Sequence, residues 1–166
     1  MASPRIALVG ITKHGVASMS RLAALMPEAD IIVTEKFATS LPESSNTVRV
    51  LSGALSAHIG DLFQSYDQLV FFVSLGAVVR LIAPHLKSKD EDPGVLVVDD
   101  AAQFVIPVLS GHVGGANAHA ELIAGLLDAT PVLTTASDVG KTIPVDILGR
   151  ELGWQVEDPK INITRV

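Results

Sequence analysis

The chain has 166 residues and a formal net charge of −6; 48% of its residues are hydrophobic and 18% are charged. This composition predicts a well-buried globular domain, and the scattered lysines and arginines argue against a nucleic-acid partner. The absence of cysteine excludes disulfides, cysteine-ligated zinc and thiolate catalysis. The longest apolar runs fall far short of the roughly 20 residues that span a bilayer, and no signal-peptide stretch is visible, so we expect a cytoplasmic protein without membrane contact.

The apolar pattern predicts strands and helices that alternate along the chain. The predicted strands are residues 5–10, 29–34, 68–73, 94–99, 104–109 and 131–134. The predicted helices are residues 14–26, 51–66, a segment through 78–82 that Pro84 ends or kinks, 114–127 and 143–152. Residues 38–47, rich in serine, proline and asparagine, are predicted to form a surface loop.

The strand at 69–73 is apolar throughout, which is typical of a parallel strand covered by helices on both faces. The fold class is therefore α/β: a three-layer, open, mainly parallel sheet with helices on both faces. The strands at 6–9, 69–73 and 95–98 should be central. Strand 104–109 should pair antiparallel with the strand before it, as a hairpin near residues 94–109.

A glycine-rich loop, residues 109–117, leads from strand 104–109 into a predicted helix. Glycines let backbone N–H groups approach a ligand, and a helix N-terminus adds partial positive charge, so this loop is predicted to bind a polar or anionic ligand. Its spacing fits neither a dinucleotide fingerprint nor a Walker A loop, so a nucleotide is not expected. The candidate ligand contacts are Ser110, Gly111, Gly114, Gly115 and Asn117, with Asn117 on the side of its helix opposite the core.

Two kinds of candidate catalytic group lie close by in the sequence. His112 lies between glycines of the loop, and a loop histidine titrates near neutrality, so it is predicted to act as a general base or substrate donor; the alternative is a solvent-facing loop residue. Asp99 and Asp100 end a strand, where each could contact a ligand or simply turn the hairpin. Ser110 lacks the G-x-S-x-G elbow and a visibly placed acid, which favours a hydrogen-bonding role over a nucleophilic one.

Two further segments are candidate rims of the same site. Ser74 and Gly76 open a turn between a strand and a helix, and Arg80 follows one turn later, with a ligand contact and a plain surface role equally open. Residues 134–138 read first as a helix N-cap and second as a third rim, with Thr135 and Asp138 as contacts. Since ligand sites of open α/β sheets gather at strand ends, we expect these loops to converge on one edge of the sheet. No HExxH motif, paired histidines or carboxylate cluster points to a protein-bound metal.

The stretch between residues 74 and 138 resembles the N-terminal region of the cobalt-precorrin-5A hydrolase family. The resemblance rests on residues 76–84, 92–100, 104–117 and 134–139, which occur in the family's order. Residues 1–73 fit as the family's preceding α/β half, and residues 147–154 resemble its lead-in to a central segment. The resemblance implies an α/β domain at 1–140 and, at 141–166, the lead-in to a central segment and a C-terminal domain.

The resemblance implies a step of anaerobic cobalamin (vitamin B12) biosynthesis. Water opens the δ-lactone of cobalt-precorrin-5A, and a two-carbon fragment leaves as acetaldehyde, giving cobalt-precorrin-5B. The substrate is a macrocycle ringed with carboxylates and the chain is acidic, so recognition should be local, through backbone N–H groups, Arg80, Lys87 or Lys89. His112 or Asp99 would activate water, and amides of the glycine-rich loop would hold the oxyanion. Cobalt would arrive with the substrate, with no cofactor bound by the protein.

Two other functions stay open at this point. The chain could be a non-catalytic corrinoid-binding module that works with a partner chain or a missing C-terminal domain, and other cobalamin-pathway enzymes are further candidate partners. A generic nucleotide-binding α/β protein ranks lowest, because the phosphate fingerprints are absent.

Overall fold

The computed structural model describes residues 3–111 and 114–135. The chain divides into two compact units, residues 1–133 and residues 134–166. All the helices and strands given below belong to the first unit, and of the second only Thr134 and Thr135 are described. The predicted helix at 143–152 lies outside the described residues.

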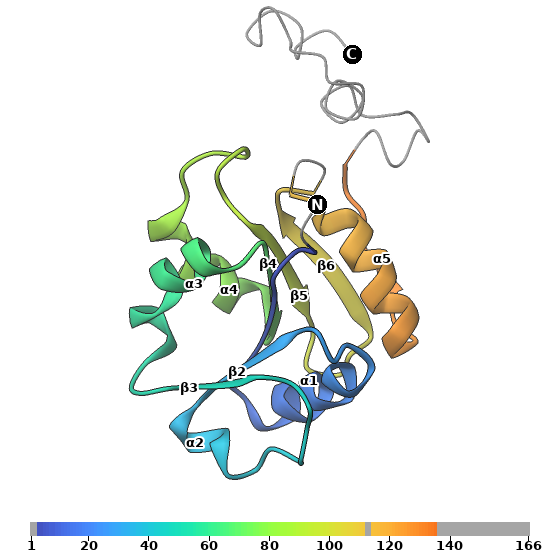
Figure 1. Cartoon of the computed structure of the whole chain (residues 1–166). Helices are drawn as coiled ribbons and strands as arrows, with labels where there is room; N and C mark the ends of the chain where they lie inside the picture. The colour runs from blue at the N-terminus through green and yellow to red at the C-terminus, as the bar shows by residue number, and fades with distance from the viewer. Residues whose placement is uncertain (1–2, 112–113, 136–166) are drawn as a thin grey trace, which may run out of the picture. The chain divides into compact units, whose positions relative to one another are not determined.

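The first unit is built on a seven-stranded sheet with the order β3-β2-β1-β4-β5-β6-β7 (Figure 1). The strands are β1 (Ile6–Gly10), β2 (Asp30–Thr34), β3 (Val48–Leu51), β4 (Gln68–Phe72), β5 (Gly94–Val98), β6 (Phe104–Leu109) and β7 (Thr130–Pro131). The first five run parallel, β6 pairs antiparallel with β5, and β7 runs parallel to β6. The mainly parallel sheet, its antiparallel pair and the central position of β1, β4 and β5 are confirmed.

Helices cover both faces of this sheet. They are α1 (Lys13–Leu25), α2 (Glu35–Ala38), α3 (Ile59–Ser65), α4 (Leu75–Ile82) and α5 (Ala116–Leu127), with 3₁₀ turns at Leu55–Ala57 and Ala83–His85. α1 and α5 lie on one face, and α3 and α4 on the other (Figure 1). Successive residues of a strand point to opposite faces: on β4, Val70 packs with α1 and α5, whereas Leu69 packs with α3 and α4. The three-layer arrangement is confirmed.

One helix was predicted too long at its start, and the edge strand before it was not predicted. Residues 51–66 were predicted as helical, but β3 occupies Val48–Leu51 and α3 begins only at Ile59. Gly53 between them has φ +78°, a left-handed conformation that ends any helical run through it. In the structure, exposed Val48 and Val50 alternate with the less exposed Arg49 and Leu51, as in a strand. Four residues are too few for this alternation to predict a strand from the sequence.

α1 approaches the centre of the sheet unusually closely at Gly15. Thr12 caps the helix, since its Oγ1 accepts a hydrogen bond of 2.9 Å from the Gly15 N–H. A Cβ at Gly15 would lie 2.1 Å from the carbonyl oxygen of Phe72 at the end of β4. The absent side chain therefore sets the distance between α1 and the sheet.

No helix among the described residues has the length and apolarity needed to cross a membrane.

Tyr66 links two strands where they begin, and this link should depend on pH. Its hydroxyl donates a 2.8 Å hydrogen bond to Asp30 Oδ2, and burial, followed by this bond, raises the pKa of Tyr66. The stabilisation is fully present below the phenol's unfolded pKa of about 10 and is lost as the pH rises through the higher folded value. Tyr66→Phe should lower the free energy of unfolding by about 1–2 kcal/mol at pH 7. In urea titrations the difference between the two proteins should shrink above about pH 10; a difference that stays constant to pH 11 would contradict this role.

Candidate functional site

The predicted site residues that the structure describes in the first unit fall at two opposite edges of the sheet. We call the end at which β1 to β5 finish the carboxyl edge, and the end at which they start the amino edge. Because β6 runs antiparallel to β5, its last residue, Leu109, pairs with Val95 near the start of β5. The described residues of the glycine-rich loop that follows β6 therefore lie at the amino edge.

Ser74 and Gly76 lie at the carboxyl edge, where α4 begins. Ser74 is the N-cap of α4 but makes no side-chain cap bond, and a Cβ at Gly76 would meet nothing within 4 Å. Both residues are exposed, as is Arg80 in the last turn of the same helix. The helix start is open to solvent, and among the described residues Arg80 has no hydrogen bond or ion pair to another predicted contact.

The carboxylate of Asp99 is engaged by the turn that follows β5. Its Oδ1 accepts hydrogen bonds from the N–H groups of Gln103 (2.8 Å) and Phe104 (2.7 Å), and its Oδ2 accepts one from Ala101 (3.3 Å). This geometry supports the turn alternative for Asp99 and leaves little acceptor capacity for a water molecule. Asp100 is exposed, and its Oδ1 accepts a 3.1 Å hydrogen bond from Thr12 Oγ1.

Removal of the Asp99 carboxylate should therefore act on stability. Asp99→Ala should lower the free energy of unfolding by about 2 kcal/mol, because three backbone N–H groups lose a charged acceptor. The neighbouring change Asp100→Ala is the matched control and should cost about 0.5 kcal/mol or less. Urea denaturation measures both, and equal effects would contradict the assignment.

At the amino edge, the described part of the glycine-rich loop is tied to its surroundings. Ser110 has φ +54°, and its Oγ donates a 3.0 Å hydrogen bond to the carbonyl oxygen of Asp92 and a 3.5 Å one to that of Lys89. A Cβ at Gly114 would lie 2.5 Å from the Cβ of Ser110, so only glycine fits there. Gly115, with φ +76°, is the N-cap of α5. The Ser110 hydroxyl is thus engaged within the protein, and its hydrogen bond to a substrate stays a prediction.

Two amides expected to face a ligand point back into the loop instead. The N–H of Ala116 donates to the carbonyl oxygen of Ser110 (3.3 Å), and the N–H of Asn117 donates to that of Gly111 (3.0 Å). Asn117 is also buried, at 7% exposure, so its predicted place opposite the core is wrong. The helical period was read correctly, but the loop folds over this first turn and encloses the side chain beside Gly111.

The predicted convergence of the strand-end loops on one edge is wrong. At a rise of about 3.3 Å per residue, a five-residue strand such as β5 separates the turn at Asp99 from the glycine-rich loop by about 16 Å. Ser74, Gly76, Asp99 and Asp100 therefore cannot line one compact site with Ser110, Gly111, Gly114, Gly115 and Asn117. His112 and Asp138 lie outside the described residues, and Thr135 belongs to the second unit.

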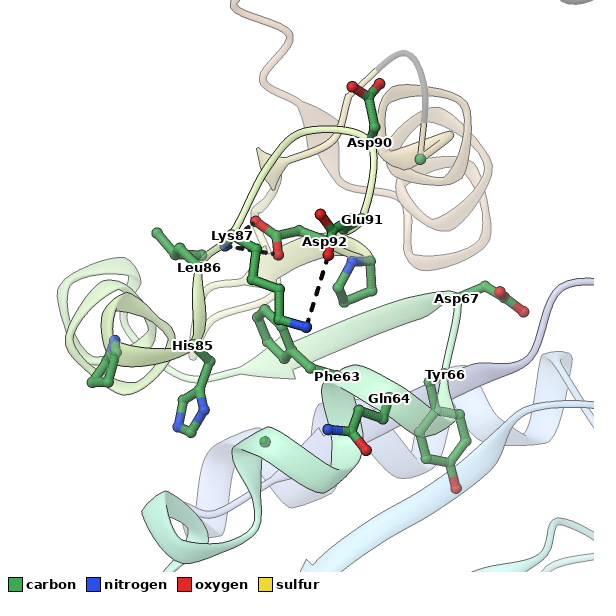
Figure 2. Close-up of a pocket in the computed structure, with 14 residues that line it drawn as sticks. Phe63, Gln64, Tyr66, Asp67, His85, Leu86, Lys87, Asp90, Glu91 and Asp92 are labelled. Atoms are coloured by element: carbon green, nitrogen blue, oxygen red, sulfur yellow. Dashed lines mark hydrogen bonds and ion pairs between the residues drawn. The ribbon is translucent and has the colours of Figure 1, made fainter.

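A cavity of about 690 Å³ opens at the amino edge, next to the glycine-rich loop (Figure 2). Gly114 lines it, together with α3 on one side and the segment of residues 84–93 on the other. Phe63 and Leu86 supply apolar walls, and the ring of His85 lies 6.2 Å from that of Phe63, centre to centre. The volume falls in the range of small-molecule sites.

Acidic residues of this cavity are largely engaged in local contacts. Lys87 donates its backbone N–H to both carboxylate oxygens of Asp92 at 3.1 Å, and its Nζ lies 3.8 Å from Glu91 Oε2. Asp67 Oδ2 accepts a 2.7 Å hydrogen bond from the backbone N–H of Arg5. Figure 2 shows the Asp90 carboxylate directed away from Lys87. Lys87 is the lysine of the lining and the group there best suited to attract a substrate carboxylate.

Sequence reasoning identified Lys87 but missed the cavity around it. Phe63 falls within the helix predicted at residues 51–66, and His85 is not among the candidate residues. The available signal was the charged segment between Pro84 and Pro93, just before a strand, and such a pattern is equally typical of an ordinary surface loop. Among residues 3–111 and 114–135, no group of three or more histidines, aspartates or glutamates is arranged to hold a metal ion.

Known proteins resemble this chain over nearly all its length. A family model described as cobalamin synthesis G N-terminal matches residues 57–138. The cobalt-precorrin-5A hydrolase of Priestia megaterium is 46% identical over 160 residues, which cover 96% of this chain and 42% of the relative. The cobalt-precorrin-5A hydrolase of Salmonella typhimurium is 36% identical over 165 residues, covering 97% of this chain and 44% of that relative.

A solved structure agrees with the fold. A cobalamin biosynthesis protein G homologue from Sulfolobus solfataricus superposes with a TM-score of 0.60 at 22% identity, over 94% of this chain and 42% of its own. The chain spans less than half the length of the curated relatives it matches. It belongs to the cobalt-precorrin-5A hydrolase family and corresponds to the N-terminal region of that family.

Proposed function

We propose that this chain forms the N-terminal part of a cobalt-precorrin-5A hydrolase, which acts in anaerobic cobalamin biosynthesis. Water opens the lactone of cobalt-precorrin-5A, and the products are cobalt-precorrin-5B and acetaldehyde. The observation that carries the proposal is the 46% identity to the Priestia megaterium hydrolase over 96% of this chain. The cytoplasm is the proposed compartment, and cobalt would enter as part of the substrate.

Within this chain, the amino edge is the proposed place of contact with substrate. The cavity and the glycine-rich loop adjoin at Gly114, and the apolar walls at Phe63 and Leu86 suit the edge of a macrocycle. Lys87 would attract a peripheral carboxylate. The remaining contacts would come from the part of the protein that the relatives have beyond the region matched here.

The proposed chemistry assigns water activation to His112. A neutral imidazole can accept the proton of water as the oxygen attacks the lactone carbonyl. The resulting oxyanion needs donors other than the Ala116 and Asn117 amides, because both are bonded within the loop. Asp99 is not carried forward as an alternative base, since its carboxylate is held by the turn at the opposite edge.

A fusion enzyme tests the function directly. This chain would replace the matching N-terminal region of the Priestia megaterium hydrolase, and acetaldehyde release from cobalt-precorrin-5A would be followed. Because the two regions are similar throughout, the fusion enzyme should turn over within about tenfold of the relative. The Priestia megaterium hydrolase that lacks the matching N-terminal region, with nothing in its place, should be inactive.

The non-catalytic alternative predicts a different result. A corrinoid-binding module would improve substrate affinity, so the remainder alone would keep its kcat and show only a raised KM. A fusion enzyme that folds and binds the corrinoid but releases no acetaldehyde would also contradict the proposed function.

A further inference from the structure

Gln68 is a buried polar residue on a central strand of the sheet. It begins β4, is 2% exposed, and shares with Val70 and Phe72 the face covered by α1 and α5. The other residues of β4 are apolar and fully buried. A buried amide costs free energy unless its N–H and C=O groups have hydrogen-bond partners, so the partners of Gln68 indicate its role.

Gln68 bonds to the glycine-rich loop through its amide nitrogen but not through its amide oxygen. Nε2 donates a hydrogen bond to the carbonyl oxygen of Gly114, while Oε1 has no hydrogen-bond partner among the residues the structure describes. The side chain thus joins the start of β4 to a residue that lines the cavity.

Glycines make the space for this amide. Gln68 is in register with Gly94 on β5, where a Cβ would lie 2.1 Å from Oε1. On the other side, a Cβ at Gly115 would lie 3.6 Å from Nε2, and one at Gly114 would lie 3.2 Å from the Gly94 amide nitrogen. A side chain at position 94 would displace the Gln68 amide, so Gln68 requires glycine at position 94.

We propose that Gln68 is a positioning residue, which holds Gly114 and with it the described part of the glycine-rich loop in place beside the cavity. This inference rests on the proposed function for its effect on catalysis. Stability alone does not explain an amide at this position. Its buried Oε1 has no partner among the described residues and therefore costs free energy, which an apolar side chain of similar shape would avoid. An apolar side chain at this position could not make the hydrogen bond to Gly114, so that bond is what the amide of Gln68 provides.

Gln68→Met in the fusion enzyme separates positioning from stability. Methionine has a similar length and no N–H donor, so the free energy of unfolding should stay within about 1 kcal/mol of the parent. kcat should fall by about tenfold or more, while KM changes by less than about threefold, because the loop is misplaced and the cavity remains. A kcat equal to that of the parent overturns the proposal.

Gln68→Glu gives a second readout that a structural role would not produce. Only the protonated carboxyl can donate to the Gly114 carbonyl oxygen, and burial favours that neutral form. The ratio of kcat for Gln68→Glu to kcat for Gln68→Met should therefore rise by about fivefold or more between pH 8 and pH 6. A ratio that is flat with pH contradicts the proposal.

Amide hydrogen exchange in this full chain tests the contact independently of any activity. Gln68→Met should speed exchange of the Gly114 to Asn117 amides by about tenfold, since the loop is released from β4, with no change in α1. Unchanged exchange overturns the positioning role even if the fusion enzyme is active. An inactive parent enzyme together with faster loop exchange would instead count against the proposed function alone.

Discussion

Replacement of Gly15 by alanine should lower the free energy of unfolding by about 2–3 kcal/mol. A Cβ at this position would lie 2.1 Å from the carbonyl oxygen of Phe72 and 2.7 Å from Oγ1 of Thr12. The first neighbour is backbone, so α1 must move away from β4, and the second is the cap of the same helix. Alanine's helix propensity returns only about 1 kcal/mol, which is less than the cost of the clash.

The matched control for Gly15 is Gly125 in α5. A Cβ at Gly125 would meet nothing within 4 Å, so Gly125→Ala should raise stability by about 1 kcal/mol through helix propensity alone. Thermal unfolding should show the Gly15 variant melting about 5–10 °C below the parent and the Gly125 variant above it. A Gly15 variant as stable as the parent would show that α1 is not held at this distance.

Sequence reasoning predicted the centre of the fold well, because the central strands carry a strong signal. Residues of β1, β4 and β5 are buried from both faces, so an unbroken apolar run is required of them. At the edge of the sheet the requirement weakens. β3 has four residues and two exposed valines; residues 48–50 were predicted as no element, and Leu51 was placed in the helix predicted after them.

Strand direction explains the wrong prediction about the site. The rule that ligands gather at strand ends holds for parallel strands, whose carboxyl ends meet at one edge. β6 was predicted to be antiparallel, and the loop after an antiparallel strand necessarily lies where the parallel strands begin. The pairing and the convergence could not both be true.

Other parts of the candidate site depend on contacts that one sequence does not reveal. Asp99 left two roles open, and the choice depends on whether backbone amides fold around its carboxylate. The cavity depends on α3, the 84–93 segment and Gly114, which are separate in the chain and meet only in the folded unit. The residues around Gln68 in the sequence do not predict its hydrogen bond to Gly114.

His112→Gln should have the largest effect on activity. If His112 activates water, the fusion enzyme carrying this change should release acetaldehyde about 10²-fold more slowly, the usual size of a lost general base. Corrinoid binding should change by less than about threefold, because glutamine keeps a hydrogen-bonding group of similar reach. His112 lies outside the described residues, and its role here remains a prediction from the sequence.

The control is a histidine at the carboxyl edge of the sheet. His14 is exposed in the first turn of α1, at the carboxyl edge, and His14→Gln should change kcat by less than about threefold. Both variants should unfold at the temperature of the parent, so that a difference in turnover reports on chemistry alone.

The kcat of the His112→Gln fusion enzyme, measured as acetaldehyde formed from cobalt-precorrin-5A, tests most directly whether the glycine-rich loop at the amino edge carries the chemistry. If the loop carries the chemistry, kcat should fall by about 10², with KM nearly unchanged. Turnover equal to that of the parent would contradict it, and would place water activation outside this loop.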